Sequence, residues 1–403
     1  MQRSVAVAPP AAGPGVTFET VSDEESFAGL ADAWDALVRA MPRPSPFLLH
    51  CWLTEWWRHY GEGCSLAVQA AFRDGTLVAA LPLIIYPRHG LRIATFLGGR
   101  HSVLADLLIA DNEDATVAET LVARAASAGQ DYADLFGLPA DCRLSAVLES
   151  PPLHLFERIE APVLDLSRGW EAAYRAKTNS KKRAHHRHRR RQLAEVGRVE
   201  VSLARTRAEL EPALEDAFRL HALRWRERSD GRPDGSGFVT PAGMRFNRAV
   251  LTGLADLDVA RIITLKIDGR AIAFAYFFAL ERRMYLHRTA FDPAFARFSP
   301  GLVNALHAFE LGAAEGLTRV EFLGGAERYK LEFTDHFEPL YLGLGLAGST
   351  AGRSVVAARA CWLRFRELVK RSEAARKVYD GVAPARRRVM RRRDALRPSG
   401  VGT

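Results

Sequence analysis

The chain has 403 residues, of which 48% are hydrophobic and 26% are charged. This length exceeds what one compact core usually holds, so two domains are expected, and the composition excludes collagen-like, low-complexity and wholly disordered proteins. The longest apolar stretches, such as Leu77–Tyr86, are too short to span a bilayer. The four cysteines are scattered without metal-ligand spacing, which predicts no metal site and fits a reducing compartment.

The formal net charge of +9 comes from two segments. Residues 177–191 contain eight Lys and Arg and no acid, and residues 351–403 contain fifteen Lys and Arg against four acids. The rest of the chain is net acidic, so the charge does not describe a uniformly basic nucleic-acid-binding domain.

A disordered leader is predicted for residues 1–15, because one arginine followed by Ala, Pro and Gly lacks the apolar core of a signal peptide. We therefore expect a cytoplasmic protein, either free or peripheral at the inner membrane face.

Two stretches follow the same plan, which predicts an internal repeat. Each begins with two apolar runs joined at a turn, Asp74-Gly75 in the first copy and Asp268-Gly269 in the second, as is typical of a β-hairpin. Each continues with a helical stretch and a short strand bounded by glycines, Gly129 to Gly137 and Gly316 to Gly324. We expect each copy to form a mixed, mostly antiparallel sheet flanked by helices, an α/β (α+β) fold.

Within the glycine-bounded strands, Asp134 corresponds to Glu321. Prolines 151, 152 and 162 indicate the boundary between the copies, and Ala161–Asp165 is expected to be a strand crossing between the halves. The predicted domains are residues 16–165, a basic linker helix at 166–196, a second domain at 197–347 and a basic helical tail at 348–403.

The first basic segment, residues 177–191, has two interpretations. It is a docking surface for the phosphates of a nucleotide, an RNA or an anionic membrane, or it is a solvated helix face.

Only the second copy carries a helix start suited to an anion. In the segment Arg297–Gly301, Pro300 pre-sets the first helical turn, Ser299 is placed to cap it, and Gly301 leaves the backbone amides accessible. The amides, the helix dipole and the Arg297 charge together predict a phosphate site, although a helix start without a ligand has the same pattern. The first copy has four acids within residues 105–115 instead, which would repel a pyrophosphate.

The loop after the last strand of the second copy contains Glu327, Tyr329 and Lys330. If the flanking strands are parallel, this loop lies beside the Ser-Pro-Gly helix start. A carboxylate there can accept a proton, a phenol can return one to a thiolate, and an ammonium can hold a phosphate. A solvated polar turn is the alternative.

The tail has apolar residues at helical spacing, Trp362, Phe365, Leu368 and Val369, before two runs of arginine. This pattern predicts an amphipathic basic helix for an anionic membrane surface or a partner.

The order strand, Ser-Pro-Gly helix, strand and Gly-x-Glu-x-Tyr-Lys-x-x-Phe, which ends at Phe333, resembles the GNAT acyltransferase superfamily. More narrowly it resembles the CelD-like acetyltransferase-type group, relatives of the Fem-type aminoacyl ligases. The basic stretch Lys181–Arg191 and the pattern Phe218-x-x-His221-x-x-Arg224-Trp225 are similar to segments of that group.

The resemblance implies two GNAT-like folds in tandem and an acyl-CoA donor, with acetyl-CoA as the default. It places the donor pyrophosphate on the Ser-Pro-Gly helix and a backbone amide within Tyr285–Thr289 on the thioester carbonyl. The residues it assigns to the cofactor are Arg297, Ser299, Gly301 and His287. From the chemistry of the residues we expect Glu327 as catalytic base, Tyr329 as acid and Lys330 beside them. We expect His221, Arg224 and Trp225 to bind the acceptor.

The expected function is acyl transfer from acyl-CoA to an amine or hydroxyl of an envelope or exopolysaccharide-related acceptor, either a small molecule or a glycan- or lipid-linked precursor, without a metal. The common GNAT cofactor loop is richer in glycine than this one, which keeps a Fem-type ligase with an aminoacyl-tRNA donor open. A third interpretation is a catalytically inactive scaffold that its basic tail recruits to membranes.

Overall fold

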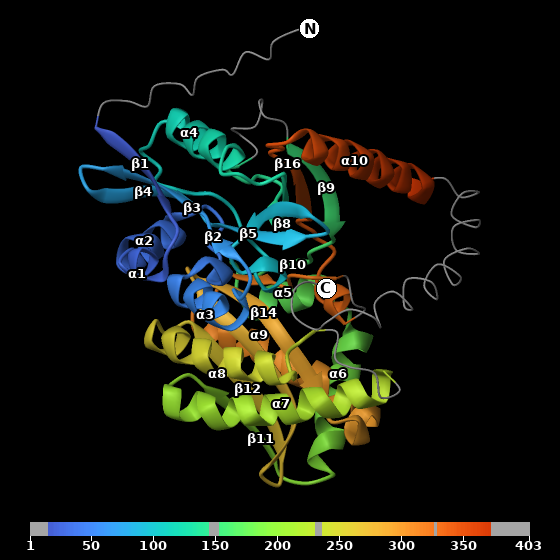
Figure 1. Ribbon diagram of the computed structural model, residues 1–403. Coiled ribbons are helices and arrows are strands. Elements are labelled where there is room, and N and C mark those ends of the chain that lie inside the picture. Colours follow the sequence, from blue (N-terminus) through green and yellow to red (C-terminus); the bar gives the residue numbers. More distant parts are fainter. Residues whose placement is uncertain (1–14, 145–152, 230–235, 326–328, 372–403) are drawn as a thin grey trace, which may run out of the picture.

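The computed structural model describes residues 15–144, 153–229, 236–325 and 329–371, with one half of the chain stacked on the other (Figure 1). The expected leader, apart from Gly15, and the arginine runs of the tail lie outside these residues. Within them, the strands form one four-stranded and two six-stranded mixed or antiparallel sheets, with helices packed on their faces. The predicted fold class is therefore confirmed. The domain boundaries stay a prediction.

The first half contains the four-stranded sheet β1-β3-β4-β7 and the six-stranded sheet β2-β5-β6-β8-β16-β9. Proline 82 separates β4 from β5 and lets the chain pass from one sheet to the other, because proline has no N–H to give to a ladder. The elements are β1 (Val16–Val21), α1 (Glu24–Ala28), α2 (Ala31–Ala40), η1 (Pro46–Leu48), α3 (His50–Tyr60), β2 (Ser65–Leu66), β3 (Val68–Arg73), β4 (Thr76–Leu81), β5 (Leu83–Arg88), β6 (Leu91–Phe96), η2 (Gly99–His101), β7 (Leu108–Ile109), α4 (Ala115–Ala126), β8 (Tyr132–Pro139) and β9 (Leu153–Ile159).

The second half is built on the sheet β10-β15-β14-β13-β12-β11. Side chains that alternate along β13 enter two different cores: Phe274 and Tyr276 pack with α7 and α8, and Ala275 and Phe277 pack with α9. The elements are β10 (Val163–Asp165), α5 (Trp170–Lys177), α6 (Ser180–Ala194), β11 (Val199–Ala204), α7 (Arg207–Ser229), α8 (Pro241–Asp256), β12 (Ala260–Ile267), β13 (Arg270–Leu280), β14 (Arg283–Phe291), η4 (Pro293–Phe298), α9 (Pro300–Ala314), β15 (Arg319–Glu321), η5 (Lys330–Glu332), β16 (Leu340–Gly345) and α10 (Thr350–Arg371).

The predicted repeat is present. Both hairpin turns have positive φ at both central residues, 50° and 78° at Asp74-Gly75 and 49° and 77° at Asp268-Gly269, as a type I′ turn requires. In the first half β6 pairs in parallel with β8, and in the second half β14 pairs in parallel with β15. The predicted parallel pair of the second half is therefore confirmed.

The two halves exchange strands. Strand β10, which follows the first half, pairs with β15 of the second sheet, as expected for a crossing strand. Strand β16, which follows the second half, lies between β8 and β9 of the first. The sheet of the second half therefore includes a strand that follows the first half, and a sheet of the first half includes a strand that follows the second.

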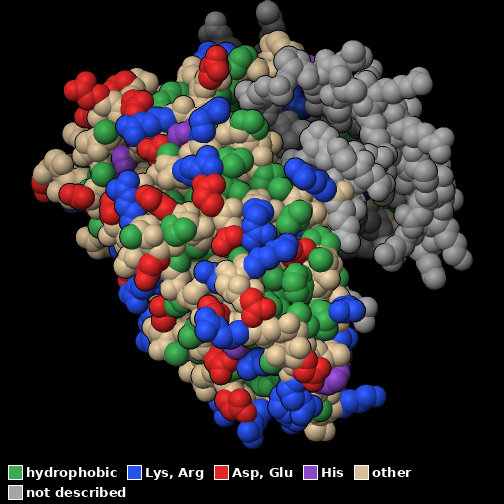
Figure 2. All heavy atoms as spheres, turned by 90° about the horizontal axis from the view of Figure 1, so that it is seen from below, with side chains coloured by type: hydrophobic (Ala, Val, Ile, Leu, Met, Phe, Trp, Pro, Cys, Tyr) green, Lys and Arg blue, Asp and Glu red, His purple; other side chains and the backbone are tan. Residues whose placement is uncertain are grey.

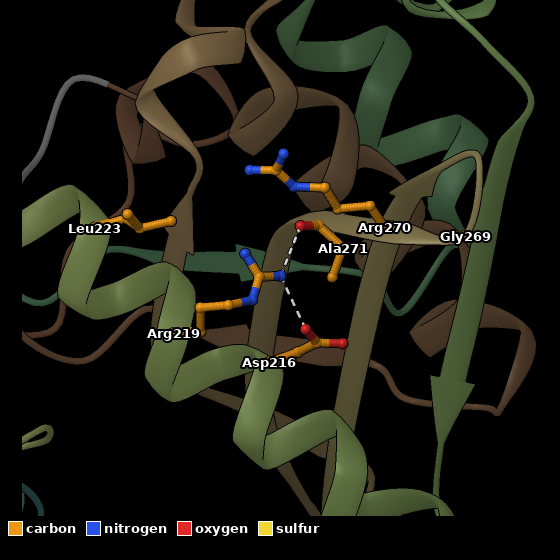
Figure 3. Close-up of a pocket in the computed structure, with 6 residues that line it drawn as sticks. All are labelled: Asp216, Arg219, Leu223, Gly269, Arg270 and Ala271. Carbon is orange, nitrogen blue, oxygen red and sulfur yellow. Dashed lines mark hydrogen bonds and ion pairs between the residues drawn. The ribbon is translucent and has the colours of Figure 1, made fainter.

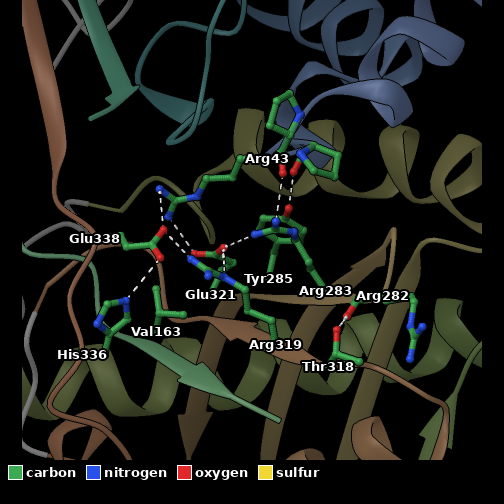
Figure 4. Close-up of polar contacts among 12 residues, drawn as sticks. Arg43, Val163, Arg282, Arg283, Tyr285, Thr318, Arg319, Glu321, His336 and Glu338 are labelled. Carbon is green, nitrogen blue, oxygen red and sulfur yellow. Dashed lines mark hydrogen bonds and ion pairs between the residues drawn. The ribbon is translucent and has the colours of Figure 1, made fainter. Parts of the chain in front are cut away.

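A buried ionic network joins the halves (Figure 4). Arg43, from the segment after α2, donates to Glu321 of β15 over 2.7 Å, and the Glu321 side chain is fully buried. Glu321 also accepts from Arg283 at 3.1 Å and from Arg319 at 2.8 Å. The equivalent acid of the first half, Asp134, pairs with Arg359 of α10 at 2.7 Å. The acid that the repeat places in each final strand therefore anchors a segment from elsewhere in the chain.

On the surface, acidic and basic side chains are mixed over the face seen in Figure 2. The basic side chains of helix α6 fall into two groups, one on each side of the helix. On its inner side, Arg189 donates to the Arg297 carbonyl at 2.8 Å and Arg190 pairs with Glu310 of α9. On its outer side, Lys181, Arg187 and Arg191 are exposed and make no ion pair within the described residues. The inner side of the basic segment therefore packs on the chain itself, and docking of phosphates by its exposed outer side stays a prediction.

Candidate active site

Strands β14 and β15 diverge at the centre of the second half. Their pairing covers only Arg283–Tyr285 with Arg319–Glu321, whereas β14 continues to Phe291. On the other edge of β14 the register with β13 skips His287, so that Leu286 and Arg288 face consecutive residues of β13. His287 is therefore the extra residue of a β-bulge. Beyond it, the edge of β14 that faces β15 has no strand partner among the described residues, so main-chain groups are available there.

Helix α9 begins beside this opening. Ser299 lies in the left-handed region, with φ 56° and ψ 49°, and its side chain makes no capping hydrogen bond. The prediction that Ser299 caps the helix through its hydroxyl is wrong, because that bond needs an extended backbone at the cap position. Instead the Ser299 carbonyl accepts from the amides of Leu302 and Val303, at 3.0 and 3.2 Å. Pro300 occupies the first helical position, as predicted.

Gly301 and Arg297 flank this helix start. A Cβ on Gly301 would lie 3.0 Å from the Phe291 ring, so glycine lets the helix start close to the end of β14. Arg297 is exposed, and its guanidinium lies over Phe298 at 4.5 Å. The proposed binding of a phosphate by Arg297, Ser299 and Gly301 stays a prediction.

The residues predicted to bind the acceptor lie on α7. The His221 ring stacks on Trp225, with centroids 6.0 Å apart, and its Nε2 lies 3.3 Å from Ser236 Oγ. The Arg224 guanidinium lies over Phe291 at 4.3 Å, and Phe291 is the residue that packs on Gly301. Arg224 and the start of α9 are thus brought together through one aromatic ring.

Lys330 has a position that the sequence did not indicate. Its ammonium is buried and donates to three carbonyls at the end of β15: Phe322 at 3.1 Å, Gly324 at 2.6 Å and Gly325 at 3.1 Å. An ammonium has three N–H groups, so this geometry makes Lys330 a residue that fixes the loop after β15. Tyr329 is half-buried against the core of α9, and Glu327 lies outside the described residues. Their catalytic roles stay predictions.

His287 faces an aromatic cluster between the two halves. Its ring lies 5.9 Å from Phe47 and 5.7 Å from Trp52, both of the first half, and 5.0 Å from Phe278. It makes no hydrogen bond to another described residue and is largely, but not fully, buried. Burial lowers its pKa well below the usual value, and the nearby charge of Arg288 lowers it further. The imidazole is therefore neutral at pH 7.

A second histidine, His101 of the first half, was missed by the sequence analysis. Its Nδ1 accepts a hydrogen bond from the indole N–H of Trp56 at 3.0 Å, and its ring stacks on Tyr60 at 4.5 Å. Neutral His101 must therefore carry its proton on Nε2 and act there as a donor. Burial, with the Arg288 charge, lowers its pKa to about 4. No local motif marks His101, because its partners are on α3 and α8.

In the first half β6 and β8 also pair over a short stretch, Ile93 and Ala94 with Tyr132 and Ala133, but other chain lies against the end of β8. After β6 its chain lies against the end of β8, where the Ala105 amide donates to the Gly137 carbonyl at 3.1 Å. Asp106 is buried and accepts from the amides of Leu107, Arg143 and Leu144. Asp114 caps helix α4. Both acids therefore satisfy amide donors of the chain itself.

A pocket of about 430 Å³ lies between α7 and the β12–β13 turn (Figure 3). Arg219 in its wall donates to Asp216 at 2.8 Å and to the Ala271 carbonyl at 2.9 Å, and Arg270 pairs with Asp292 at 2.6 Å. Both cations are compensated by these partners, so the pocket gives no reason to assign it an anion. Among the described residues no three His, Cys, Asp or Glu side chains gather as a metal site would require.

Residues 180–331 match the sequence model of the acetyltransferase (GNAT) domain, so the chain carries a GNAT-type acyltransferase domain in its second half. No curated protein matches the chain. Among solved structures, FemX is similar at 11% identity and a TM-score of 0.56, covering 81% of this chain and 96% of FemX. The C-terminal domain of a protein named as a putative lysylphosphatidylglycerol synthetase, from Agrobacterium fabrum, is similar at 14% identity and a TM-score of 0.53, covering 84% and 97%. A protein of unknown function from Bacteroides thetaiotaomicron is similar at 13% identity and a TM-score of 0.54, covering 81% and 100%. These similarities show the fold, which is of the tandem GNAT kind.

Proposed function

We propose that the second half transfers an acyl group, acetyl by default, from acyl-CoA to an amine or hydroxyl acceptor that enters between the two halves. The observation that carries this proposal is the opening between β14 and β15, with the bulge at His287 on one side and the start of α9 on the other. A thioester in the opening would meet the edge of β14 that has no strand partner among the described residues. Its phosphates would reach the amides at the start of α9.

In this account His287 is the general base. The acceptor nucleophile attacks the thioester carbonyl carbon, the carbon–sulfur bond breaks, and the thiol leaves. His287 takes the proton that the acceptor gives up, because it is neutral at pH 7, partly exposed, and without a hydrogen-bond partner among the described residues. His101, held as an Nε2–H donor by Trp56, orients the acceptor from the opposite side of the interface. Tyr329 keeps its proposed role as the acid for the thiolate, and Glu327, the base proposed from the sequence, is the alternative to His287.

The test measures thiol release from acetyl-CoA with a panel of amino sugars, polyamines and sugar alcohols. In H287Q we expect turnover to fall by about 100-fold or more while acetyl-CoA affinity changes less than threefold. Turnover of the wild type should stay level from pH 8 to 6, because His287 remains unprotonated there. Undiminished turnover in H287Q would show that His287 is not the general base. Absence of acetyl-CoA binding by the wild type would show that acyl-CoA is not the donor.

A second candidate is aminoacyl transfer from a charged tRNA. Two observations favour it: the fold is similar to FemX and to the synthetase domain, and the outer face of α6 presents Lys181, Arg187 and Arg191. Charged tRNA that binds with a steep salt dependence, and loses affinity in K181E/R187E/R191E, would favour this donor over acyl-CoA. Acetyl-CoA binding in that triple variant serves as the control.

The acceptor class remains as proposed from the sequence: an envelope or exopolysaccharide-related molecule, small or linked to a glycan or lipid. We place no metal in this mechanism.

A further inference from the structure

Helix α10 has two opposite apolar faces. The inner face, Val356, Ala360 and Leu363, is buried against the second sheet of the first half, and Arg359 pairs with Asp134. The outer face carries Trp362, Phe365 and Leu368, whose exposed fractions are 43%, 63% and 66%. In Figure 1 this end of the helix projects beyond the sheet.

The clustered, exposed hydrophobic side chains of the outer face have few counterparts elsewhere in the described chain. Large exposed hydrophobic side chains are otherwise represented there only by Val196, Leu331 and Phe337, which are on separate segments. The three residues of α10 are spaced by three, so they share one side of the helix, and helical geometry puts them opposite the buried face. Moving these side chains from water into an apolar phase would favour the bound state.

Cations border this outer face on both sides. At about 100° per residue, Arg364 lies at one edge of the strip and Arg366 at the other, and the Arg366 guanidinium lies over the Trp362 ring at 5.7 Å. The chain beyond Arg371 has nine Lys and Arg against three acids. A second copy of this chain would meet like charge here, whereas an anionic surface would meet opposite charge.

We propose that the outer face of α10 docks on an anionic phospholipid bilayer, with Trp362, Phe365 and Leu368 among the acyl chains and glycerol groups and the flanking arginines on lipid phosphates. The combination of an aromatic and aliphatic strip with bordering arginines is what an interfacial helix requires. None of the helices in the described residues is long and apolar enough to cross a bilayer, so the helix lies along the surface. This proposal does not depend on the acyltransfer chemistry.

The test is cosedimentation of the full chain with vesicles of phosphatidylcholine containing 30% phosphatidylglycerol, compared with pure phosphatidylcholine. We expect binding to the anionic vesicles only. We expect F365S/L368S, which leaves the net charge unchanged, to bind at least tenfold more weakly. We expect R364E/R366E not to bind, and high salt to weaken the binding of the wild type. The matched control is V196S/F337S, which removes two exposed hydrophobic side chains elsewhere and should bind like the wild type.

Three results would overturn the proposal. One is a wild type that does not bind the anionic vesicles. The second is unchanged binding of F365S/L368S, which would assign the interaction to charge outside the strip. The third is a wild-type dimer in solution that F365S/L368S converts to a monomer, which would assign the outer face to a second copy. Circular dichroism of each variant verifies that α10 stays folded.

Discussion

Gly137 and Gly324 are at equivalent positions of the repeat, but the first is closely packed and the second is not. A Cβ on Gly137 would lie 2.7 Å from the Val103 carbonyl oxygen, and the residue has φ +90°. A Cβ on Gly324 would meet no atom within 4 Å, and its φ is not positive. The first half is therefore filled where the second is open, which is the asymmetry that the proposed donor site requires.

We predict that G137A destabilises the protein by about 2–3 kcal/mol, because it adds both a steric contact with backbone and a strained φ. G324A should change the free energy of unfolding by less than about 0.5 kcal/mol. Urea denaturation of both variants measures this difference. Equal losses at the two positions would mean that the halves are packed alike.

The Arg43–Glu321 contact should contribute strongly to holding the halves together. R43M leaves Glu321 buried with two of its three arginines, so we expect a loss of about 3 kcal/mol. R39M is the matched control, since Arg39 pairs with Glu281 at the surface, where their side chains are 36% and 44% exposed. Its loss should stay below about 1 kcal/mol. A small, equal effect of both changes in a denaturation experiment would show that the network is dispensable.

Removing the Lys330 ammonium should loosen the loop after β15. K330M leaves three buried or half-buried carbonyls without their donor, and we expect a loss of about 2–3 kcal/mol. Hydrogen exchange at the Phe322 amide, which donates to the Pro162 carbonyl at 3.1 Å, should become faster. K182M is the control, because Lys182 makes only a 3.5 Å contact to the Glu332 carbonyl. Unchanged exchange in K330M, with lost turnover, would instead indicate a direct catalytic role.

The indole of Trp56 should keep His101 neutral. In W56F the ring remains but the donor to Nδ1 is gone, so we expect the pKa of His101 to rise from about 4 toward its ordinary value. Burial remains the larger cause, so the rise will be partial. Nuclear magnetic resonance titration of the histidines measures it, and an unchanged pKa would mean that the hydrogen bond does not matter.

His101 also makes stability depend on pH. In the unfolded chain this histidine is protonated below about pH 6.5, whereas in the native state it is protonated only below about pH 4. Acidification between these values therefore favours unfolding. Between pH 8 and pH 5 the wild type should lose about 2 kcal/mol more than H101Q. The pKa of Asp106, which burial raises to about 6, works in the opposite direction but equally in both proteins. An equal pH dependence of the two proteins would contradict the assignment.

The sequence predicted the elements that local patterns define. The Asp-Gly turns and the helix start at Pro300 follow from turn chemistry and proline geometry, and both are present. The crossing strand was expected at Ala161–Asp165 and is found at Val163–Asp165. The helix of the tail follows from its apolar spacing.

Features set by distant contacts were not predictable in this way. The left-handed backbone of Ser299 ends the short helix η4, so its geometry depends on how η4 packs and not on the Ser-Pro pair. The partners of Lys330 are carbonyls, which carry no residue signature, and His101 meets Trp56 only because α3 and η2 are folded together. The residues of the second half were therefore proposed from the sequence, but the contribution of the first half to the candidate site was not.

Titration calorimetry of the full chain with acetyl-CoA tests the asymmetry most directly. We predict one molecule bound per chain, with affinity at least tenfold weaker in R297E. R100E is the matched control in the first half, since Arg100 is also exposed and lies over an aromatic ring, Phe136, at 5.0 Å. R100E should bind like the wild type. Two molecules per chain, or a loss in R100E with none in R297E, would contradict the account.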